Sequence, residues 1–599
     1  MTLTDFEWVY GAEPGPDGRV VWISDATGRP QPWLDGRCLP VPGSVRRCVW
    51  RPDGARLLVL TDPDGGEDHR LGELDPATGE VRWLVAEPGV RCEIGVPYGG
   101  TGDPYNANGT LLAYASNARD HEVFDVLVRD ANGSRIVLRG DDRYLPLGFS
   151  PDSRVLLVLK LHQNTDHELF AVDLATDTVR QLTRFDGPAK YEPVAWLPDS
   201  SGIYLCTTQG RDFTGLATLS LDGELTWLDT PESDVEGGAL SRDGTRIAWG
   251  RNEDGYTRLL WAEIGGNPRE LRGEPREVTG LPRGLAICEF GYGGHALHFT
   301  HSGELLVQLA QGNAATELYL ADLDAGTAKR LTDFGAGLPD DLVAPTVVHA
   351  TSADGLRVPC LLYRPPSASA DDPVPVVMTV HGGPESQAYP EYYPMVQSLL
   401  AHGIGVIAPN FRGSSGYGLR YQRTVYRDWG GGDLEDLAAT AALLEDVDWA
   451  DGTRLGVHGA SYGGFAALSC VTRLPHLWRA AVSECGTSDL LSDIRNGPPT
   501  WRRRTAEWIG DPDDPADRAR LVERSPLGHA HRVQAPVLLM HGENDTRVDP
   551  EESEQMYRRL RELGKPVRLE LHPGIGHEIN REGLADTVEM IVGWFTTNL

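Results

Sequence analysis

The stretch HGASYGGF, His458 to Phe465, decides how the second half of the chain is interpreted. It follows a short apolar run, Arg454 to Val457, that is typical of a β-strand, and Phe465 opens a run typical of a helix. A serine between glycines at such a strand-to-helix turn, here Ser461, has the Gly-x-Ser-x-Gly pattern of a nucleophile elbow. The alternative is a glycine-rich loop with an incidental serine, and five residues alone do not decide between the two.

From about Leu338 onward, strand-like and helical runs alternate. We expect strands at PVPVVMTV, GIGVIAP, RLGVHG, RAAVSEC, APVLLMHG and VRLELHP, with helical stretches such as DLEDLAATAALLEDV between them. Nearly continuous apolar strands separated by helices predict a doubly wound, mainly parallel sheet. Ser461 ends one of these strands, where open α/β sheets place their sites. The sequence therefore predicts an α/β-hydrolase catalytic domain over residues 338–599.

A serine hydroxyl becomes a nucleophile only when a base takes its proton and a third group orients that base. In α/β-hydrolases the acid and then the histidine follow the serine, each after a later strand. Asp545 follows APVLLMHG, 84 residues beyond Ser461, and His577 follows VRLELHP, 32 residues further. We predict that Ser461, Asp545 and His577 are the catalytic residues.

Other residues near these loops are alternatives for the acid and for the base. Glu543 and Asp549 are competing acids that we expect to be solvated loop charges, and His572 is a competing base that we expect to be structural. The oxyanion of a tetrahedral intermediate also needs donors. We predict the backbone N–H groups of Tyr462, after the nucleophile, and of Gly383, in the HGGP loop after PVVMTV.

The first 337 residues repeat one local pattern. A turn such as Pro-Asp-Gly precedes a short β-rich run seven times, and its third position is Gly18, Gly54, Gly109, Ser153, Ser200, Gly244 and Gly303, at intervals of 36 to 59 residues. A second, weaker repeat is seen in LDPATGEVRWL, LATDTVRQLT and LDAGTAKRLT. Asp-Gly between β-rich runs predicts tight hairpins, which need positive φ. Several strands per unit of about forty residues predict an all-β, seven-bladed β-propeller over residues 1–337, the alternative being a β-sandwich.

Composition excludes several classes of partner. The 599 residues include 55 basic and 87 acidic ones, a net charge of −32, which argues against nucleic acid or an anionic membrane as a partner. We see no signal peptide and no membrane-spanning stretch, and the eight cysteines form no CxxC pair. We therefore expect a cytoplasmic protein without disulfides, metal or cofactor.

A propeller followed by a hydrolase, with HGGP, PNFRGSSGYG, HGASYGG, HGENDTRV and PGIGHE in that order, resembles the prolyl oligopeptidase family of serine peptidases. The resemblance covers essentially the whole chain, and it is greatest to the acylaminoacyl-peptidase and aminopeptidase branch. It implies a propeller that gates the active site and admits only short peptides or small amides. It also implies the same triad, Ser461, Asp545 and His577, and the same oxyanion donors, Tyr462 and Gly383.

The resemblance further implies residues that bind substrate. The family's carbonyl-binding arginine falls on Arg547, and Val548 beside it is included in the same site; Arg412 and Tyr417 are expected to buttress it. The proline-cutting members carry an aromatic cage in the segment after the strand that follows the nucleophile helix. In this chain that segment is SECGTSDLLSDIRNGPPTW, which offers Leu490, Leu491, Ile494 and Trp501 instead. A broader apolar or aromatic preference is therefore expected.

Three functions remain open at this stage. The first is a serine peptidase acting on short peptides or on aminoacyl and acylaminoacyl amides, aminoacyl-linked antibiotics included. The second is a carboxylesterase, since the same triad cleaves esters. The third is a propeller-based binding protein with a vestigial hydrolase, against which the complete set of catalytic residues counts. A homo-oligomer is compatible with all three.

Overall fold

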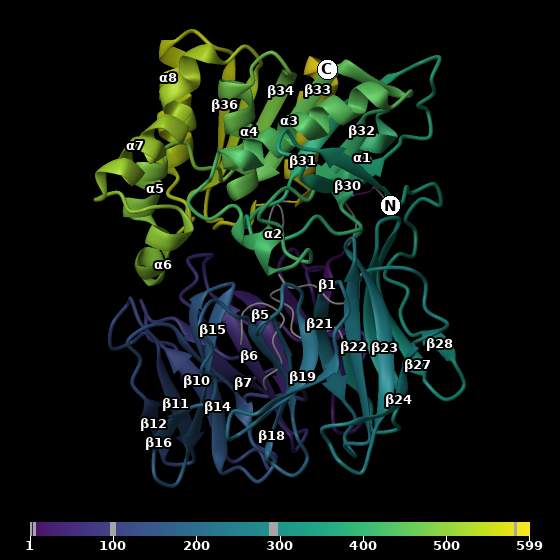
Figure 1. The fold of residues 1–599 in the computed structure, drawn as a ribbon, viewed down its shortest axis with the longest axis vertical. Coiled ribbons are helices and arrows are strands. Elements are labelled where there is room, and N and C mark those ends of the chain that lie inside the picture. The colour runs from purple at the N-terminus through teal and green to yellow at the C-terminus, as the bar shows by residue number, and fades with distance from the viewer. Residues whose placement is uncertain (1–2, 4–6, 96–102, 287–296, 580–583) are drawn as a thin grey trace.

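The computed structural model describes the chain except for residues 1–2, 4–6, 96–102, 287–296 and 580–583. In Figure 1 the protein consists of two stacked parts, an all-β part and an α/β part, with α2 (Leu419–Arg423) and α6 (Arg502–Trp508) projecting toward the β part. No helix within the described residues combines the length and the apolar character needed to cross a membrane.

The described strands of the β part form seven four-stranded antiparallel sheets, each built from four consecutive strands. The seven-bladed β-propeller predicted from the repeated turns is thus confirmed. The strands are β1 (Val9–Pro14), β2 (Val20–Ser24), β3 (Gln31–Leu34), β4 (Arg37–Cys38); β5 (Ser44–Trp50), β6 (Leu57–Asp62), β7 (Arg70–Leu74), β8 (Val81–Val85); β9 (Cys92–Glu93), β10 (Leu112–Ser116), β11 (Asp125–Asp130), β12 (Gly133–Leu138); β13 (Tyr144–Phe149), β14 (Val155–Gln163), β15 (Asp166–Asp173), β16 (Thr178–Gln181); β17 (Tyr191–Trp196), β18 (Gly202–Thr207), β19 (Gly215–Ser220), β20 (Leu225–Asp229); β21 (Val235–Leu240), β22 (Arg246–Glu253), β23 (Tyr256–Ile264), β24 (Leu271–Glu277); and β25 (Leu297–Phe299), β26 (Leu305–Gln311), β27 (Ala314–Asp322), β28 (Thr327–Arg330).

The repeated turns fall at one place in every blade, between its first and second strands. All seven third positions have positive φ, from 60° at Ser153 to 87° at Gly303. In each turn the N–H of this residue donates to the carbonyl three residues earlier, as Gly54 does to Arg51 at 2.8 Å. The left-handed conformation explains why glycine stands at five of the seven positions.

The α/β part contains one eight-stranded sheet with the order β29-β30-β32-β31-β33-β34-β35-β36. Its strands are β29 (Thr346–Thr351), β30 (Arg357–Tyr363), β31 (Val374–Val380), β32 (Gly405–Pro409), β33 (Ala450–Ala460), β34 (Trp478–Glu484), β35 (Val537–Gly542) and β36 (Val567–His572). Six of them pair in parallel, and β29 and β30 extend the sheet in antiparallel fashion. The expected doubly wound, mainly parallel α/β-hydrolase sheet is confirmed, whereas the β29–β30 hairpin was not predicted.

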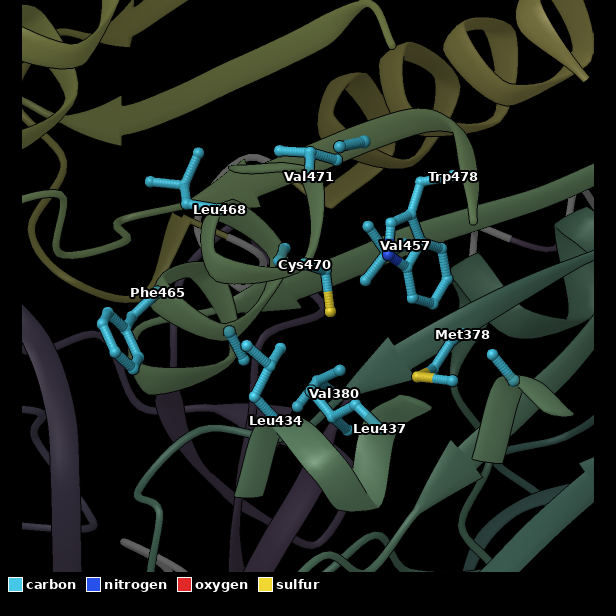
Figure 2. Packing of buried hydrophobic residues seen from close by; sticks show 14 of the residues in the cluster. Met378, Val380, Leu434, Leu437, Val457, Phe465, Leu468, Cys470, Val471 and Trp478 are labelled. Atoms are coloured by element: carbon cyan, nitrogen blue, oxygen red, sulfur yellow. The ribbon is translucent and has the colours of Figure 1, made fainter. Parts of the chain in front are cut away.

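Helices cover both faces of this sheet. Successive side chains of a strand point alternately to the two faces, and each face has its own hydrophobic core. Val377 faces α1 (Pro394–Ala401) and α10 (Leu584–Asn598) in one core. Its neighbours Val376 and Met378 face α3 (Gly432–Leu443), α4 (Tyr462–Arg473) and α8 (Glu551–Glu562) in the other. Figure 2 shows this second core, where side chains of α3 and α4 meet those of β31, β33 and β34. The labelled residues are Met378, Val380, Leu434, Leu437, Val457, Phe465, Leu468, Cys470, Val471 and Trp478.

One of the contacts between propeller and hydrolase is made by the segment from Asp62, the end of β6, to His69, just before β7. The Asn544 and Thr546 side chains donate to the carbonyls of Asp64 and Gly66, at 3.0 and 3.4 Å. A Cβ on Gly65 would lie only 2.8 Å from the amide nitrogen of Gly576, so the two backbones touch. This loop therefore contacts the two segments that follow β35 and β36. The predicted division between residues 337 and 338 falls between β28 and β29 and stays a prediction.

Candidate active site

Ser461 lies in a strained turn between β33 and α4. Its φ of 59° and ψ of −122° are values that a residue with a side chain rarely adopts. The neighbouring glycines permit this turn: a Cβ on Gly459 would lie 2.3 Å from the Gly463 carbonyl oxygen, and one on Gly463 would lie 2.1 Å from that of Val380. The sequence therefore places a serine at the start of α4, at the carboxyl edge of the sheet.

Asp545 and His577 lie in the loops after β35 and β36, and the structure brings their side chains together. His577 Nδ1 is 2.6 Å from Asp545 Oδ2. Asp545 Oδ1 accepts the backbone N–H groups of Arg547, at 2.8 Å, and Val548, at 3.1 Å. Burial alone raises the pKa of Asp545, but His577 and His541 beside it more than offset this, so that its pKa is held well below the ordinary value. The carboxylate therefore stays ionised and fixed in orientation.

No hydrogen bond joins Ser461 Oγ to the His577 ring among the described residues. Catalytic hydrogen bonds are often long in the absence of substrate and tighten when substrate binds. The acid–histidine pair is thus formed in this structure, whereas the serine–histidine contact is not.

Of the two predicted oxyanion donors, Tyr462 directly follows the nucleophile in the chain and Gly383 belongs to the loop that passes it. Tyr462 is the first residue of α4, and its ring stacks on Phe411, with 5.3 Å between centroids. Gly383 has a φ of 118°, and a Cβ on the preceding Gly382 would lie 3.5 Å from Ser461 Cβ. The HGGP loop therefore runs directly past the serine side chain, which is the proximity that an oxyanion donor requires.

Arg547 reaches across to the propeller. Its Nε lies 2.5 Å from Glu67 Oε1, and Glu67 is also bound by Arg91 of the propeller at 2.6 Å. Glu67 is buried, but the two guanidinium groups outweigh that burial and hold the pKa of its carboxyl well below the usual range. The sequence could not reveal this pair, because Glu67 and Arg547 are 480 residues apart.

The four predicted pocket residues lie in two different environments, the hydrolase core and a cavity. Leu490 and Ile494 of α5 (Leu490–Asn496) are 1% and 8% exposed and belong to the hydrolase core, with Leu491 packed against it. Trp501, in contrast, lines a small cavity of about 40 Å³ between hydrolase and propeller. The other lining residues are Gln163, Asn164, Glu385, Arg504 and Trp508. Of the four, Trp501 is the one that borders a described cavity.

The competing residues have contacts of their own. Asp549 accepts the Glu551 N–H at the start of α8 and an Asn496 amide at 3.1 Å, and Glu543 is exposed. The expected buttresses are also engaged: Arg412 binds Asp436 at 2.8 Å, and the Tyr417 hydroxyl accepts from Asn410 at 2.9 Å. These contacts leave Asp545 as the acid bound to His577.

A residue that sequence reasoning missed is His541, four positions before Asp545. It is fully buried, and its Nε2 lies 3.2 Å from Asp545 Oδ2. Cys485, His541 and Asp545 each offer a ligand-type atom within 4.8 Å of the others, a group that could also hold a metal ion. The only signal in the sequence was a histidine inside an otherwise apolar strand end, VLLMHG.

Comparison with known proteins gives the same picture. Residues 390–599 match the model of the prolyl oligopeptidase family. The dipeptidyl aminopeptidase BIII of Pseudoxanthomonas mexicana is 27% identical over 596 residues, 94% of this chain and 83% of that protein. The human acylamino-acid-releasing enzyme is 28% identical over 250 residues, 41% of this chain and 34% of that protein.

Solved structures share the fold over the full length. A puromycin-hydrolyzing peptidase of Mycobacterium tuberculosis superposes with a TM-score of 0.80 at 21% identity, covering 100% of this chain and 96% of the other. The family model thus places the carboxyl-terminal part of the chain, residues 390–599, among serine peptidases of the prolyl oligopeptidase family, and the whole chain is similar in sequence to a dipeptidyl aminopeptidase.

Proposed function

We propose that the protein hydrolyses short peptides or aminoacyl and acylaminoacyl amides through an acyl-enzyme on Ser461. His577 takes the proton of the Ser461 hydroxyl as its oxygen attacks the scissile carbonyl, and it returns that proton to the leaving amine. Water, deprotonated by the same imidazole, then releases the acyl group. Asp545 orients His577 and stabilises its charged form.

The observation that carries this proposal is the 2.6 Å contact between His577 Nδ1 and Asp545 Oδ2, in loops at the carboxyl edge of the sheet that also carries the strained Ser461. Since Nδ1 faces the carboxylate, Nε2 is the nitrogen left to act on the serine. The N–H groups of Tyr462 and Gly383 are proposed to stabilise the oxyanion, supported by the passage of the HGGP loop beside Ser461.

Substrate recognition is proposed to use Arg547, with Val548 beside it, and a pocket wall formed by Trp501. Leu490, Leu491 and Ile494 are proposed to support this wall from the hydrolase core. A guanidinium fixed by Glu67 suits a second peptide carbonyl beyond the scissile bond, which a simple ester lacks. This contact favours an amide substrate over the second candidate, a carboxylesterase. The similarity to a dipeptidyl aminopeptidase and to acylamino-acid-releasing enzymes supports the same choice.

Location and assembly are part of the proposal. We infer a cytoplasmic protein, a view supported by free thiols at all seven described cysteines. The strongly acidic composition supports short peptides as partners in preference to nucleic acid or an anionic membrane. A homo-oligomer is compatible with this function.

The test is active-site labelling. A fluorophosphonate is expected to modify Ser461 alone, and Ser461→Ala to lower kcat by about a million-fold while the protein stays folded, because the catalytic residues act as a unit. Peptide mapping after labelling and circular dichroism of the variant provide the readouts. Labelling of Ser414 or Ser415, which lie nearby in FRGSSGYG, or residual activity of several per cent, would overturn the assignment of the nucleophile.

A further inference from the structure

A second histidine, His541, contacts the same carboxylate oxygen of Asp545 that His577 does. His541 Nε2 lies 3.2 Å from Asp545 Oδ2, and His577 Nδ1 lies 2.6 Å from it. The side chains of His541 and Asp545 are both fully buried. The two imidazoles therefore share one buried carboxylate oxygen, with His541 on the buried side and the partly exposed His577 beside it.

The surroundings of His541 fix which of its nitrogens carries the proton. Nε2 faces two acceptors, the ionised Asp545 carboxylate and the Val548 carbonyl at 3.0 Å. Nδ1 faces the hydroxyl of Ser553 on α8 at 2.7 Å, a group that can donate. A neutral imidazole satisfies all of these contacts only when Nε2 carries the hydrogen and Ser553 donates to Nδ1. His541 is thereby set as a donor toward Asp545.

With His541 included, each oxygen of the Asp545 carboxylate has two nitrogen neighbours. Oδ1 accepts from the Arg547 and Val548 amides, and Oδ2 faces His577 and His541. The other titratable groups near this carboxylate are the Cys485 thiol and Asp493 of α5. Four donors from different directions prevent the carboxylate from rotating, which keeps Oδ2 aimed at His577.

We propose that His541 is a positioning residue of the catalytic apparatus: through its Nε2–H it holds the Asp545 carboxylate in place and limits the negative potential that Asp545 exerts on His577. This inference rests on the proposed function, in which Asp545 and His577 are catalytic. It predicts an effect on the ionisation of His577 as well as on rate. A donated hydrogen bond draws charge from the carboxylate, so its removal leaves a more negative carboxylate beside His577 and favours the charged form of the imidazole.

The experiment compares His541→Leu, which removes the donor, with His541→Gln, whose amide N–H can occupy the position of Nε2. For His541→Leu we expect kcat/KM on an aminoacyl anilide to fall about ten- to hundred-fold, the range for loss of a bond to a charged group. In the pH profile of kcat/KM, the rising limb of His541→Leu should lie at higher pH than that of the wild type, by about half a unit. For His541→Gln we expect kcat/KM within about threefold of the wild-type value and a rising limb of the pH profile near the wild-type pH.

Two outcomes would overturn the proposal: equal losses in the Leu and Gln variants, or a rising limb that stays in place in His541→Leu. His167→Leu is the matched control, since His167 is a buried propeller histidine bonded to the Tyr191 backbone. This control should lower the midpoint of thermal unfolding and leave the rising limb of the kcat/KM pH profile at its wild-type pH.

If His541→Leu does not fold, Ser553→Ala keeps the imidazole and removes the donor that selects its tautomer. This variant should move the limb in the same direction, and a silent Ser553→Ala would contradict the proposal.

Asp545→Asn separates this inference from the function on which it rests. If Asp545 is the catalytic acid, this variant loses about 10⁴ in kcat. Retained activity in Asp545→Asn would remove the proposed function itself. A large loss there, together with an unaffected His541→Leu, would remove only the role of His541.

Discussion

His381, the first residue of the HGGP loop, is a histidine whose surroundings keep it neutral. Its Nδ1 lies 2.8 Å from the Gly382 carbonyl, its Nε2 lies 2.8 Å from Ser414 Oγ, and its ring stacks on Phe411 at 4.5 Å. Burial outweighs the contact with the Gly382 carbonyl and lowers the pKa of His381 to about 4. The loop that passes the nucleophile is thus held by an uncharged imidazole at neutral pH.

This residue makes folding stability depend on pH in a defined direction. The unfolded chain takes up a proton at His381 near pH 6.5 and the native protein only near pH 4, so stability falls as pH decreases between these values. From pH 7 to pH 5 this one residue should cost about 2 kcal/mol. In His381→Gln, which does not titrate, that loss is absent. The gap in thermal midpoint between wild type and variant should therefore narrow at pH 5, and a constant gap would contradict the pKa shift.

Residue roles were predictable from sequence to different extents. It could be expected that Ser461, Asp545 and His577 lie at the same edge of the sheet, because each follows the carboxyl end of a parallel strand. Leu490 and Ile494 show the limit of this reasoning. Both are apolar residues in the expected segment, but side-chain chemistry does not reveal whether a helix turns them toward substrate or toward the core, where they lie.

At the scale of elements, the turn between β33 and α4 has no room for a side chain at two of its positions. The glycines at 459 and 463 are required by carbonyl oxygens 2.3 and 2.1 Å from the place of a Cβ. The glycine at 593 offers a contrast, since it lies on the exposed side of α10 with nothing within 4 Å of a Cβ. One residue type therefore serves a steric need in one element and none in the other.

Alanine substitutions should separate these two cases. Gly463→Ala places a methyl group against the Val380 carbonyl, so we expect loss of fluorophosphonate labelling and a lower thermal midpoint or insoluble protein. Gly593→Ala should raise stability by up to about 1 kcal/mol, because alanine favours the helix. Thermal unfolding and labelling measure both effects. A destabilised Gly593→Ala, or a fully active Gly463→Ala, would disagree with the packing described above.

Most elements could be predicted because their signals are local. The seven turns all have the positive φ that Asp-Gly patterns indicate, and strands such as β31, β32 and β35 are largely apolar and largely buried. The hairpin of β29 and β30 was missed for a physical reason. β29 is an edge strand with mostly half-exposed residues, so TVVHAT contains no continuous apolar run.

At the scale of the whole molecule, two ion pairs link the propeller to the loops of the candidate site. Arg547 binds Glu67 at 2.5 Å, and the buried propeller residue Arg46 binds Glu578, next to His577, at 3.0 Å. Arg46 also binds Asp62 at 2.9 Å. The first pair involves the residue proposed to read the peptide, and the second adjoins the residue proposed to perform the chemistry.

The two pairs should therefore differ in their effect on substrates. Arg547→Ala should lower kcat/KM about ten- to hundred-fold for acetyl-aminoacyl anilides and little for short-chain esters, because esters lack the second carbonyl. Arg46→Met should lower it for both, since the histidine loop serves every substrate. Arg246→Met, which breaks a propeller pair with Asp324, is the control and should change neither. Equal losses on all substrates for Arg547→Ala would show that the arginine supports the site without reading the peptide.

The consecutive strands of each blade have a consequence for biosynthesis. Because the described strands of each blade are consecutive in the chain, each blade can complete its hydrogen bonds soon after its own residues leave the ribosome, from the amino terminus onward. The loop of residues 62–69 is translated about 480 residues before the segments that carry Asp545 and His577. When those last segments emerge, the surface that receives them already exists. The propeller is thus a template on which the final catalytic loops settle, as well as a cover over them.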